Sequence, residues 1–179
     1  MINQIDPNYI ENTVYIDSLN IDPFDVVDQD SVWITGGYAL KRYVAGAWID
    51  GDIDYTVRDE EARARVVKYF DQFNHNEKRI GKLGTVFYKI GDFIVNILGD
   101  MYDDPRKRFF QHDLSVCQIA HDGTQYIMSK ICYEHTKRMI FSRANRTWFK
   151  GGENPLLDRL HKYESRGFLY SKKEDTYHE

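Results

Sequence analysis

The stretch Val32–Val57, VWITGGYALKRYVAGAWIDGDIDYTV, decides the fold of this chain. Its apolar start, Val32–Thr35, is typical of a short buried strand and runs directly into a Gly-Gly turn, and a second strand begins around Asp52 and Asp54. Side chains alternate along a strand, so these two aspartates point to the same face. Two carboxylates on one face repel each other, and a divalent cation between them relieves that repulsion. The spacing therefore predicts a metal site.

The glycine pair predicts a phosphate site beside these carboxylates. Gly36 and Gly37 have no Cβ, so the backbone can approach a ligand closely and offer its N–H groups to a phosphate. Lys41 and Arg42 lie in the helix expected over Tyr38–Val44 and add positive charge. A phosphate-binding turn followed by metal-binding carboxylates is the combination that phosphoryl and nucleotidyl transfer require.

At these residues the chain resembles the DNA polymerase β-type nucleotidyltransferase superfamily. The signature of that superfamily is a Gly-Gly or Gly-Ser pair after an apolar residue, then a helix, then Asp-x-Asp or Asp-x-Glu on the next strand. Here it reads TGG at 35–37 and DIDY at 52–55, with a slightly long gap and a less apolar residue, Thr35, before the glycines. The resemblance implies an α/β (α+β) fold, a mixed sheet flanked by helices with a short C-terminal helical extension.

The superfamily usually carries a third carboxylate on a strand beside the Asp-x-Asp strand, where it completes the metal site and helps to deprotonate the attacking group. Asn96, in FIVNIL, takes that place in a simple polymerase-like topology, but an amide cannot act as a base. Asp113, in QHDLSVCQIAHDG, lies in a stretch similar to a Phe-Asp-plus-strand motif of small viral and phage nucleotidyltransferases, with His112 in place of the aromatic residue. We favour Asp113, so the resemblance implies that Asp52, Asp54 and Asp113 hold two Mg²⁺ ions, for which Mn²⁺ can substitute.

The stretch 155–168, PLLDRLHKYESRGF, also resembles the closing segment of that viral group. Arg159, Lys162 and Arg166 are spaced to share one face of the helix expected there. This face either binds the triphosphate, through Arg159 and Lys162, or is a solvated surface, and both interpretations stay open.

Charge is distributed unevenly along the chain, whose net charge is −4. Residues 1–30 contain seven acidic residues and no Lys or Arg, whereas residues 130–173 contain eleven basic and four acidic residues. A basic C-terminal third predicts an anionic partner, unless the acidic segment packs on it. We expect an acidic segment over 1–30 packing on the core, a nucleotidyltransferase core over 31–123 and basic helices over 124–179.

Composition and cysteine usage predict a cytoplasmic enzyme. A chain of 179 residues can form one compact domain, and its hydrophobic residues, 42% of the total, come in runs too short to span a membrane. The N-terminus lacks the pattern of a signal peptide. Cys117 and Cys132 are expected to be two buried thiols in a reducing cytosol, that of the host if the protein is viral. The histidines make no paired zinc-ligand spacing with them.

The remaining sequence predicts further elements that complete an α/β unit. Residues 6–19 are compatible with either a helix or a strand. The elements expected after the second strand are a helix over Asp59–Phe73, a hairpin of Thr85–Ile90 and Phe93–Leu98, a short helix over Pro105–Phe110, a strand over Asp113–Ala120, and helices over Gln125–Met139 and Pro155–Ser165.

We therefore expect a metal-dependent nucleotidyltransferase that moves an NMP from an NTP to a hydroxyl acceptor and releases pyrophosphate. An RNA 3′ end, a protein side chain and a small molecule all fit as the acceptor, and the oligomeric state stays open. The alternative is a catalytically degenerate module of the same fold, similar to an antitoxin or an inhibitor. Metal-dependent nucleotide binding distinguishes the two, because a degenerate module should lack it.

Overall fold

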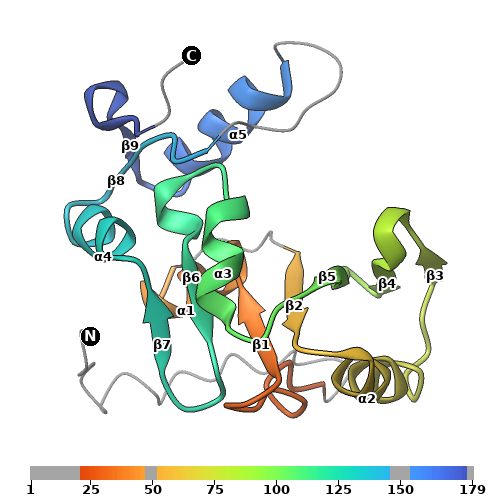
Figure 1. The fold of residues 1–179 in the computed structure, drawn as a ribbon. Coiled ribbons are helices and arrows are strands. Elements are labelled where there is room, and N and C mark those ends of the chain that lie inside the picture. The colour runs from red at the N-terminus through yellow and green to blue at the C-terminus, as the bar shows by residue number, and fades with distance from the viewer. Residues whose placement is uncertain (1–20, 47–51, 146–153, 177–179) are drawn as a thin grey trace.

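The computed structural model describes residues 21–46, 52–145 and 154–176, and the segment 6–19 lies outside these ranges. Its main sheet has the strand order β3-β4-β5-β2-β1-β6-β7 (Figure 1). These strands are β1 (Val32–Thr35), β2 (Ile53–Val57), β3 (Glu77–Ile80), β4 (Val86–Ile90), β5 (Phe93–Met101), β6 (Ile119–His121) and β7 (Tyr126–Met128). Within this main sheet, β2 and β5 pair in parallel and the other neighbouring strands pair antiparallel, so the sheet is mixed, as the sequence predicts.

Helices and short helical turns surround this sheet. They are α1 (Gly37–Tyr43), α2 (Glu60–Phe70), η2 (Lys82–Gly84), α3 (Pro105–Arg108), η3 (Phe109–Gln111), η4 (Ser115–Cys117), α4 (Lys130–Lys137), α5 (Asn154–Glu164) and η5 (Lys172–Glu174). A second, two-stranded sheet joins β8 (Ile140–Phe141) to β9 (Leu169–Tyr170) in parallel. Figure 1 shows α2 at one end of the molecule and α4, α5 and the small sheet at the other.

The main core lies on the face of the sheet that α1 and α2 cover. Ile34, Tyr55 and Tyr88 point to this face and are fully buried, and Phe70 of α2 packs on the two tyrosine rings. On the other face a smaller cluster surrounds Trp33, where η3 packs on the β1–β6 side of the sheet. On the β5–β4 side of that second face, Asn96 and Phe87 are half-buried and Lys89 is exposed.

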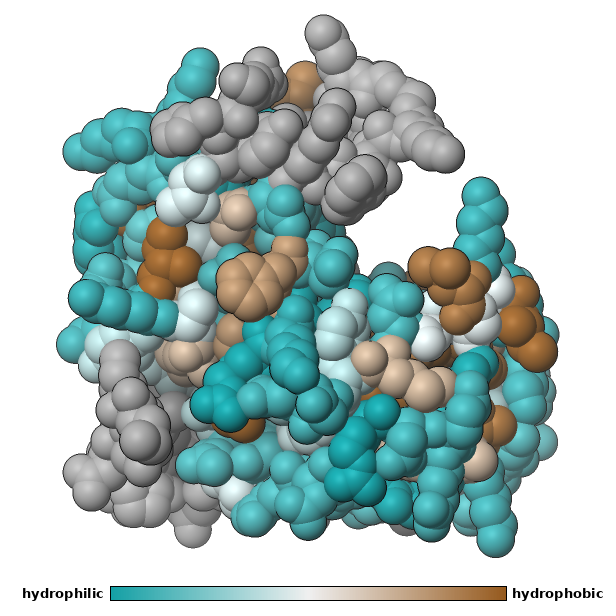
Figure 2. Space-filling model, in the orientation of Figure 1, coloured by the Kyte–Doolittle hydropathy of each residue, from teal (hydrophilic) through white to brown (hydrophobic). Residues whose placement is uncertain are grey.

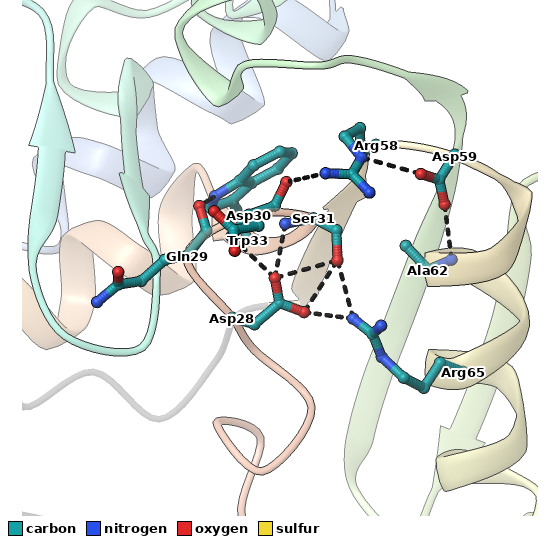
Figure 3. Close-up of polar contacts among 9 residues, drawn as sticks. All are labelled: Asp28, Gln29, Asp30, Ser31, Trp33, Arg58, Asp59, Ala62 and Arg65. Atoms are coloured by element: carbon teal, nitrogen blue, oxygen red, sulfur yellow. Dashed lines mark hydrogen bonds and ion pairs between the residues drawn. The ribbon is translucent and has the colours of Figure 1, made fainter.

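A polar turn fixes the start of β1 against α2 (Figure 3). Asp28 accepts hydrogen bonds from the backbone N–H and the hydroxyl of Ser31, and it forms an ion pair with Arg65 of α2. Asp59 caps α2 by accepting from the Ala62 N–H at 2.9 Å, which satisfies one of the open donors of the first turn. In the described part of the acidic segment, Asp28 thus contacts α2 and not the basic C-terminal helix.

Two expected elements differ in the structure. The strand expected over Asp113–Ala120 is a turn of 3-10 helix, η4, followed by the short β6. The Ser115 N–H donates to the Ser142 carbonyl at 3.0 Å, and the Ser115 hydroxyl accepts from the Ser142 N–H at 3.0 Å, so these bonds hold η4 against the segment after β8. The helix expected over Gln125–Met139 is β7 followed by α4. Ser129 separates them, because its hydroxyl caps α4 by accepting from the Cys132 N–H at 3.1 Å. The edge strand β3 was not expected.

The elements that were expected correctly include both strands of the Val32–Val57 stretch, the helix after the glycines, α2, the β4–β5 hairpin and α5. Gly167, with φ +89°, follows the end of α5 as a left-handed residue. Cys117 and Cys132 are both buried free thiols, also as expected. Within the described ranges, no helix combines the length and apolar character needed to cross a bilayer.

Candidate active site

Asp54 stands at the centre of the candidate site, in β2 and directly opposite Asn96 of the parallel strand β5. The Asn96 side-chain N–H donates to Asp54 Oδ1 at 2.9 Å. Burial raises the pKa of Asp54 to about 6, partly opposed by the Asn96 hydrogen bond and reinforced by the charge of Asp52. Asp52 immediately precedes β2 and is exposed. Asp54 is half-buried, with its carboxyl group enclosed by protein, and the exposed Asp52 lies close enough for its charge to act on Asp54.

The glycine turn closes over this carboxylate. Gly36 has φ +70°, and a Cβ built on it would lie 3.2 Å from His112 Cε1 and 3.8 Å from Asp54 Oδ2. A Cβ on Gly37 would lie 3.1 Å from the hydroxyl of Tyr163 in α5. The positive φ of Gly36 favours glycine there, and a Cβ at either position would require the neighbouring side chain to shift by a few tenths of an ångström. The Gly36 N–H already donates to the Ile119 carbonyl at 2.9 Å, so in this conformation it is not directed at a phosphate.

Lys41 and Arg42 occupy the last turn of α1, at the opposite end of the helix from the glycine turn. The Arg42 guanidinium lies 5.5 Å from the ring centroid of Phe24. A role for Lys41 and Arg42 in nucleotide binding stays a prediction.

Asp113 lies in the loop between η3 and η4 and is nearly buried, with 8% exposure. Both of its carboxylate oxygens accept hydrogen bonds from Arg159 of α5, one of them from Nη2 at 2.8 Å. Asn96, and not Asp113, holds the position opposite Asp54 on the neighbouring strand. A role for Asp113 as third metal ligand stays a prediction, and it requires that Arg159 release the carboxylate.

The basic face expected on α5 is not simply solvated. Arg159 is two-thirds buried through its ion pair with Asp113, and Arg166 is buried with its guanidinium 4.9 Å from the ring centroid of Tyr163. Lys162 is half-buried. The Arg159 charge also lowers the pKa of Asp54, which places this cation within electrostatic reach of the candidate site.

Arg108 and His112 are site residues that the sequence did not identify for this role. Arg108 ends α3, and its charge acts on both Asp54 and His112. Burial, together with the charges of Arg108 and Arg159, lowers the pKa of His112 to about 3, so its imidazole is neutral. Arg108 Nε and His112 Nε2 are buried without a hydrogen-bond partner. The signal in the sequence was the basic run RKRFFQH at 106–112, which precedes Asp113.

The donor set around Asp54 fits a magnesium ion through two carboxylates and an amide oxygen, the ligand type that Mg²⁺ prefers. Asp54 is buried with a raised pKa, which means that its charge lacks full compensation from the protein. Within the described ranges, no cluster of three or more His, Cys, Asp or Glu side chains is arranged for a metal. Asn96 and water or substrate oxygens would therefore have to complete the coordination.

Comparison with solved structures assigns this architecture to the nucleotidyltransferase type of fold. The chain is similar to a CCA-adding enzyme in complex with CTP, with a TM-score of 0.57 and 14% sequence identity over 86% of this chain and 41% of that chain. It is also similar to the Thermotoga maritima CCA-adding enzyme complexed with tRNA_CCA, with a TM-score of 0.57 and 16% identity over 85% of this chain and 40% of that chain. CCA-adding enzymes belong to the polymerase β-type nucleotidyltransferase superfamily.

A further similar structure is a tRNA-processing enzyme with CTP, with a TM-score of 0.55 and 15% identity over 79% of this chain and 40% of that chain. This chain thus spans less than half the length of these proteins. No model of a protein family and no curated protein matches the sequence. The comparisons establish the fold alone, so an activity has to be argued from the residues of the site.

Proposed function

We propose that this protein is a nucleotidyltransferase that moves an NMP from an NTP to a hydroxyl acceptor and releases pyrophosphate. The observation that carries the proposal is the placement of Asp54 beside the Gly36 turn, with Asn96 opposite it and Asp52 two residues before it in the chain. Asp52, Asp54 and Asn96 would hold Mg²⁺. When bound, the ion would lower the pKa of the acceptor hydroxyl and neutralise the leaving pyrophosphate.

The chain's own residues position the reactants around that carboxylate. The turn at Gly36 lies next to the carboxylate, since a Cβ built there would be 3.8 Å from Asp54 Oδ2, so a phosphate bound at the turn would lie close to Asp54. Arg108 lies on the same side, where its positive charge favours the negative charge of the triphosphate. The neutral His112 offers a hydrogen bond there without adding a charge.

The test compares Asp52→Asn and Asp54→Asn with the wild-type protein and with Asp92→Asn. Asp92 is exposed in the turn between β4 and β5, so its change removes the same charge elsewhere. Each protein is incubated with a labelled NTP, Mg²⁺ and cellular RNA or protein, and pyrophosphate release is measured. We expect both site variants to lose transfer by about 100-fold or more, because metal ligands act in the transition state.

Stability serves as the second measurement in this test. Asp54 is charged at neutral pH against the cost of its burial, so Asp54→Asn should keep or raise the melting temperature while it abolishes transfer. Wild-type turnover by both Asn variants in Mg²⁺ would show that the active site has been placed wrongly.

A second candidate function is a binding or regulatory module that has the same fold but no transfer activity. Two observations favour it: an amide stands opposite Asp54, and the carboxylate of Asp113 is held by Arg159. Such a module would bind no NTP in a Mg²⁺-dependent manner, whereas the proposed enzyme binds NTP more tightly when Mg²⁺ is present. Calorimetric titration with and without the ion separates the two.

A further inference from the structure

Within the described residues, the β5–β4–β3 part of the main sheet has one buried face and one partly accessible face. On the face of α1 and α2, the β4 side chains of Val86, Tyr88 and Ile90 are at most 5% exposed. On the opposite face, Phe87 is half-buried and Lys89 is exposed. Figure 2 shows hydrophilic and hydrophobic side chains mixed on the part of the molecule that carries β3 and β4.

A single row of side chains crosses this accessible face from the candidate site to the sheet edge. Strand register places Asp54 opposite Asn96, Asn96 opposite Phe87, and Phe87 opposite Arg79. Residues paired in this way share a face of the sheet. With neighbouring strands 4.7–4.9 Å apart, Phe87 stands about 10 Å and Arg79 about 15 Å from Asp54 along the row.

Phe87 and Arg79 form a stacked pair at the outer end of the row. The guanidinium carbon of Arg79 lies 4.2 Å from the centroid of the Phe87 ring, and the Arg79 side chain is 64% exposed. Glu77 contacts Arg79 from the same strand, with Oε1 at 3.5 Å from Nε. Lys89 pairs with Glu77 in the register and so lies on the same face. The accessible face of β3 and β4 thus carries two cations, one acid and one aromatic ring.

This chemistry matches a nucleobase with its phosphate. Aromatic rings and guanidinium planes stack on nucleobases, and nearby cations attract the phosphate. Stacking of this kind tolerates any base, because every base presents a π face.

The position of the pair relative to Asp54 indicates which reactant it would contact. In the proposed function the leaving pyrophosphate lies at the glycine turn, which follows β1 on one side of β2. Attacking and leaving groups are roughly in line in phosphoryl transfer, so the acceptor approaches from the other side. On that other side lie β5, β4 and β3, which carry Asn96, Phe87 and Arg79.

We propose that Phe87 and Arg79 form a platform for the terminal bases of a single-stranded nucleic-acid acceptor, whose reactive end reaches Asp54 along the row through Asn96. The inference rests on the proposed function, because that function defines the two sides of Asp54. It narrows the acceptor to a single-stranded end and assigns it a place on the protein.

The test measures binding of a fluorescently labelled single-stranded RNA oligonucleotide by anisotropy, in Mg²⁺ and without NTP. Phe87→Leu removes the aromatic ring but keeps an apolar side chain, and we expect it to weaken binding about fivefold or more. Arg79→Gln should weaken binding and lower the salt dependence. Phe87→Tyr retains the ring and should bind as the wild type does.

Lys78→Gln is the matched control for Arg79→Gln. It removes one positive charge from the same strand but from the opposite face, where Lys78 lies over Tyr88. We expect this variant to bind RNA normally. The NTP affinity, measured in parallel, should be unchanged in all four variants. If the wild type binds no RNA, if Phe87→Leu and Arg79→Gln bind RNA normally, or if they lose NTP instead, the platform assignment is wrong.

The two proposals fail in different ways. The protein could transfer an NMP to a small-molecule acceptor while Phe87→Leu leaves RNA binding unchanged. This result would overturn the platform proposal and leave the nucleotidyltransferase proposal in place. RNA binding that depends on Phe87, in a protein that transfers no nucleotide, would overturn the activity and leave the platform in place.

Discussion

At the level of single residues, two opposing effects act on the pKa of Asp54. Burial favours its protonated form and raises the pKa to about 6, whereas the Asn96 N–H stabilises the carboxylate. A carboxyl group whose pKa lies near the physiological pH range can release its proton when a cation binds. Burial is the larger effect, and the Asn96 hydrogen bond partly opposes it.

We predict that Asn96→Asp makes the protein more dependent on Mg²⁺. The variant replaces a hydrogen-bond donor with a second carboxyl group facing Asp54, so without metal the free energy of unfolding should fall by about 1–3 kcal/mol. Millimolar Mg²⁺ should then raise the melting temperature more than it does in the wild type. Asn96→Ala, which also loses the donor but adds no charge, is the control. Equal Mg²⁺ effects in all three proteins would argue against a metal at this place.

At the scale of the elements, a chain of polar contacts joins α4 to η5. Ser115 Oγ lies 2.8 Å from His135 Nδ1, and His135 Nε2 lies 3.0 Å from Glu174 Oε2. Arg138 adds two further hydrogen bonds to Glu174, at 2.7 and 2.9 Å. Ser115 and His135 are almost fully buried, so the chain of contacts holds the C-terminal turn in place and has no room for a substrate.

This contact predicts a pH dependence of stability. Hydrogen bonds from Arg138, then His135, lower the pKa of Glu174 to about 2. A carboxyl group with a lowered folded-state pKa stabilises the fold above its unfolded value, about 4.5, and that contribution is lost as the pH falls toward 2. Glu174→Gln should therefore melt below the wild type at pH 6, and the difference should disappear near pH 2. A difference that does not change with pH would contradict the assignment.

Glu134→Gln is the control for this comparison. Glu134 lies on α4 and pairs with Lys130 at 3.7 Å, with both side chains well exposed. Exposed pairs of this kind contribute little, so its melting curve should follow the wild type across the whole pH range.

At the scale of the whole molecule, α5 closes the structure over the glycine turn. Leu160 and Tyr163 are buried in the main core, and the Tyr163 hydroxyl lies 2.8 Å from Cys117 Sγ. The ion pair between Arg159 and Asp113 joins the same helix to the loop before η4. The C-terminal part of the chain thus shapes the candidate site and is not a separate extension.

Asp113→Asn should therefore act mainly on stability. We expect the melting temperature to fall by several degrees, since a partly buried ion pair loses one partner, and transfer to fall far less than in Asp54→Asn. Arg159→Gln should have the same effect, and the double variant should be little worse than either single one. An inactive Asp113→Asn variant with an unchanged melting temperature would instead make Asp113 the third metal ligand.

The sequence by itself determined the features that depend on neighbours along the chain. Period-two alternation predicted that Asp52 and Asp54 share a face, the Gly36-Gly37 pair marked the turn, and the stretch Asp59–Phe73 predicted the helix that the structure has as α2. These signals need no knowledge of the rest of the fold, because a strand, a turn and a helix cap each follow from a few consecutive residues. The resemblance to viral and phage nucleotidyltransferases stays a prediction.

Only the tertiary structure decided which distant residues meet. Asn96 faces Asp54 because β2 and β5 pair in parallel, and Arg159 reaches Asp113 across 46 positions of sequence. The row from Asp54 to Arg79 likewise depends on the register of four strands, and shifting one strand by a single residue would turn its side chains to the other face. Register and helix docking are set by the burial of the whole core, so no local pattern encodes them.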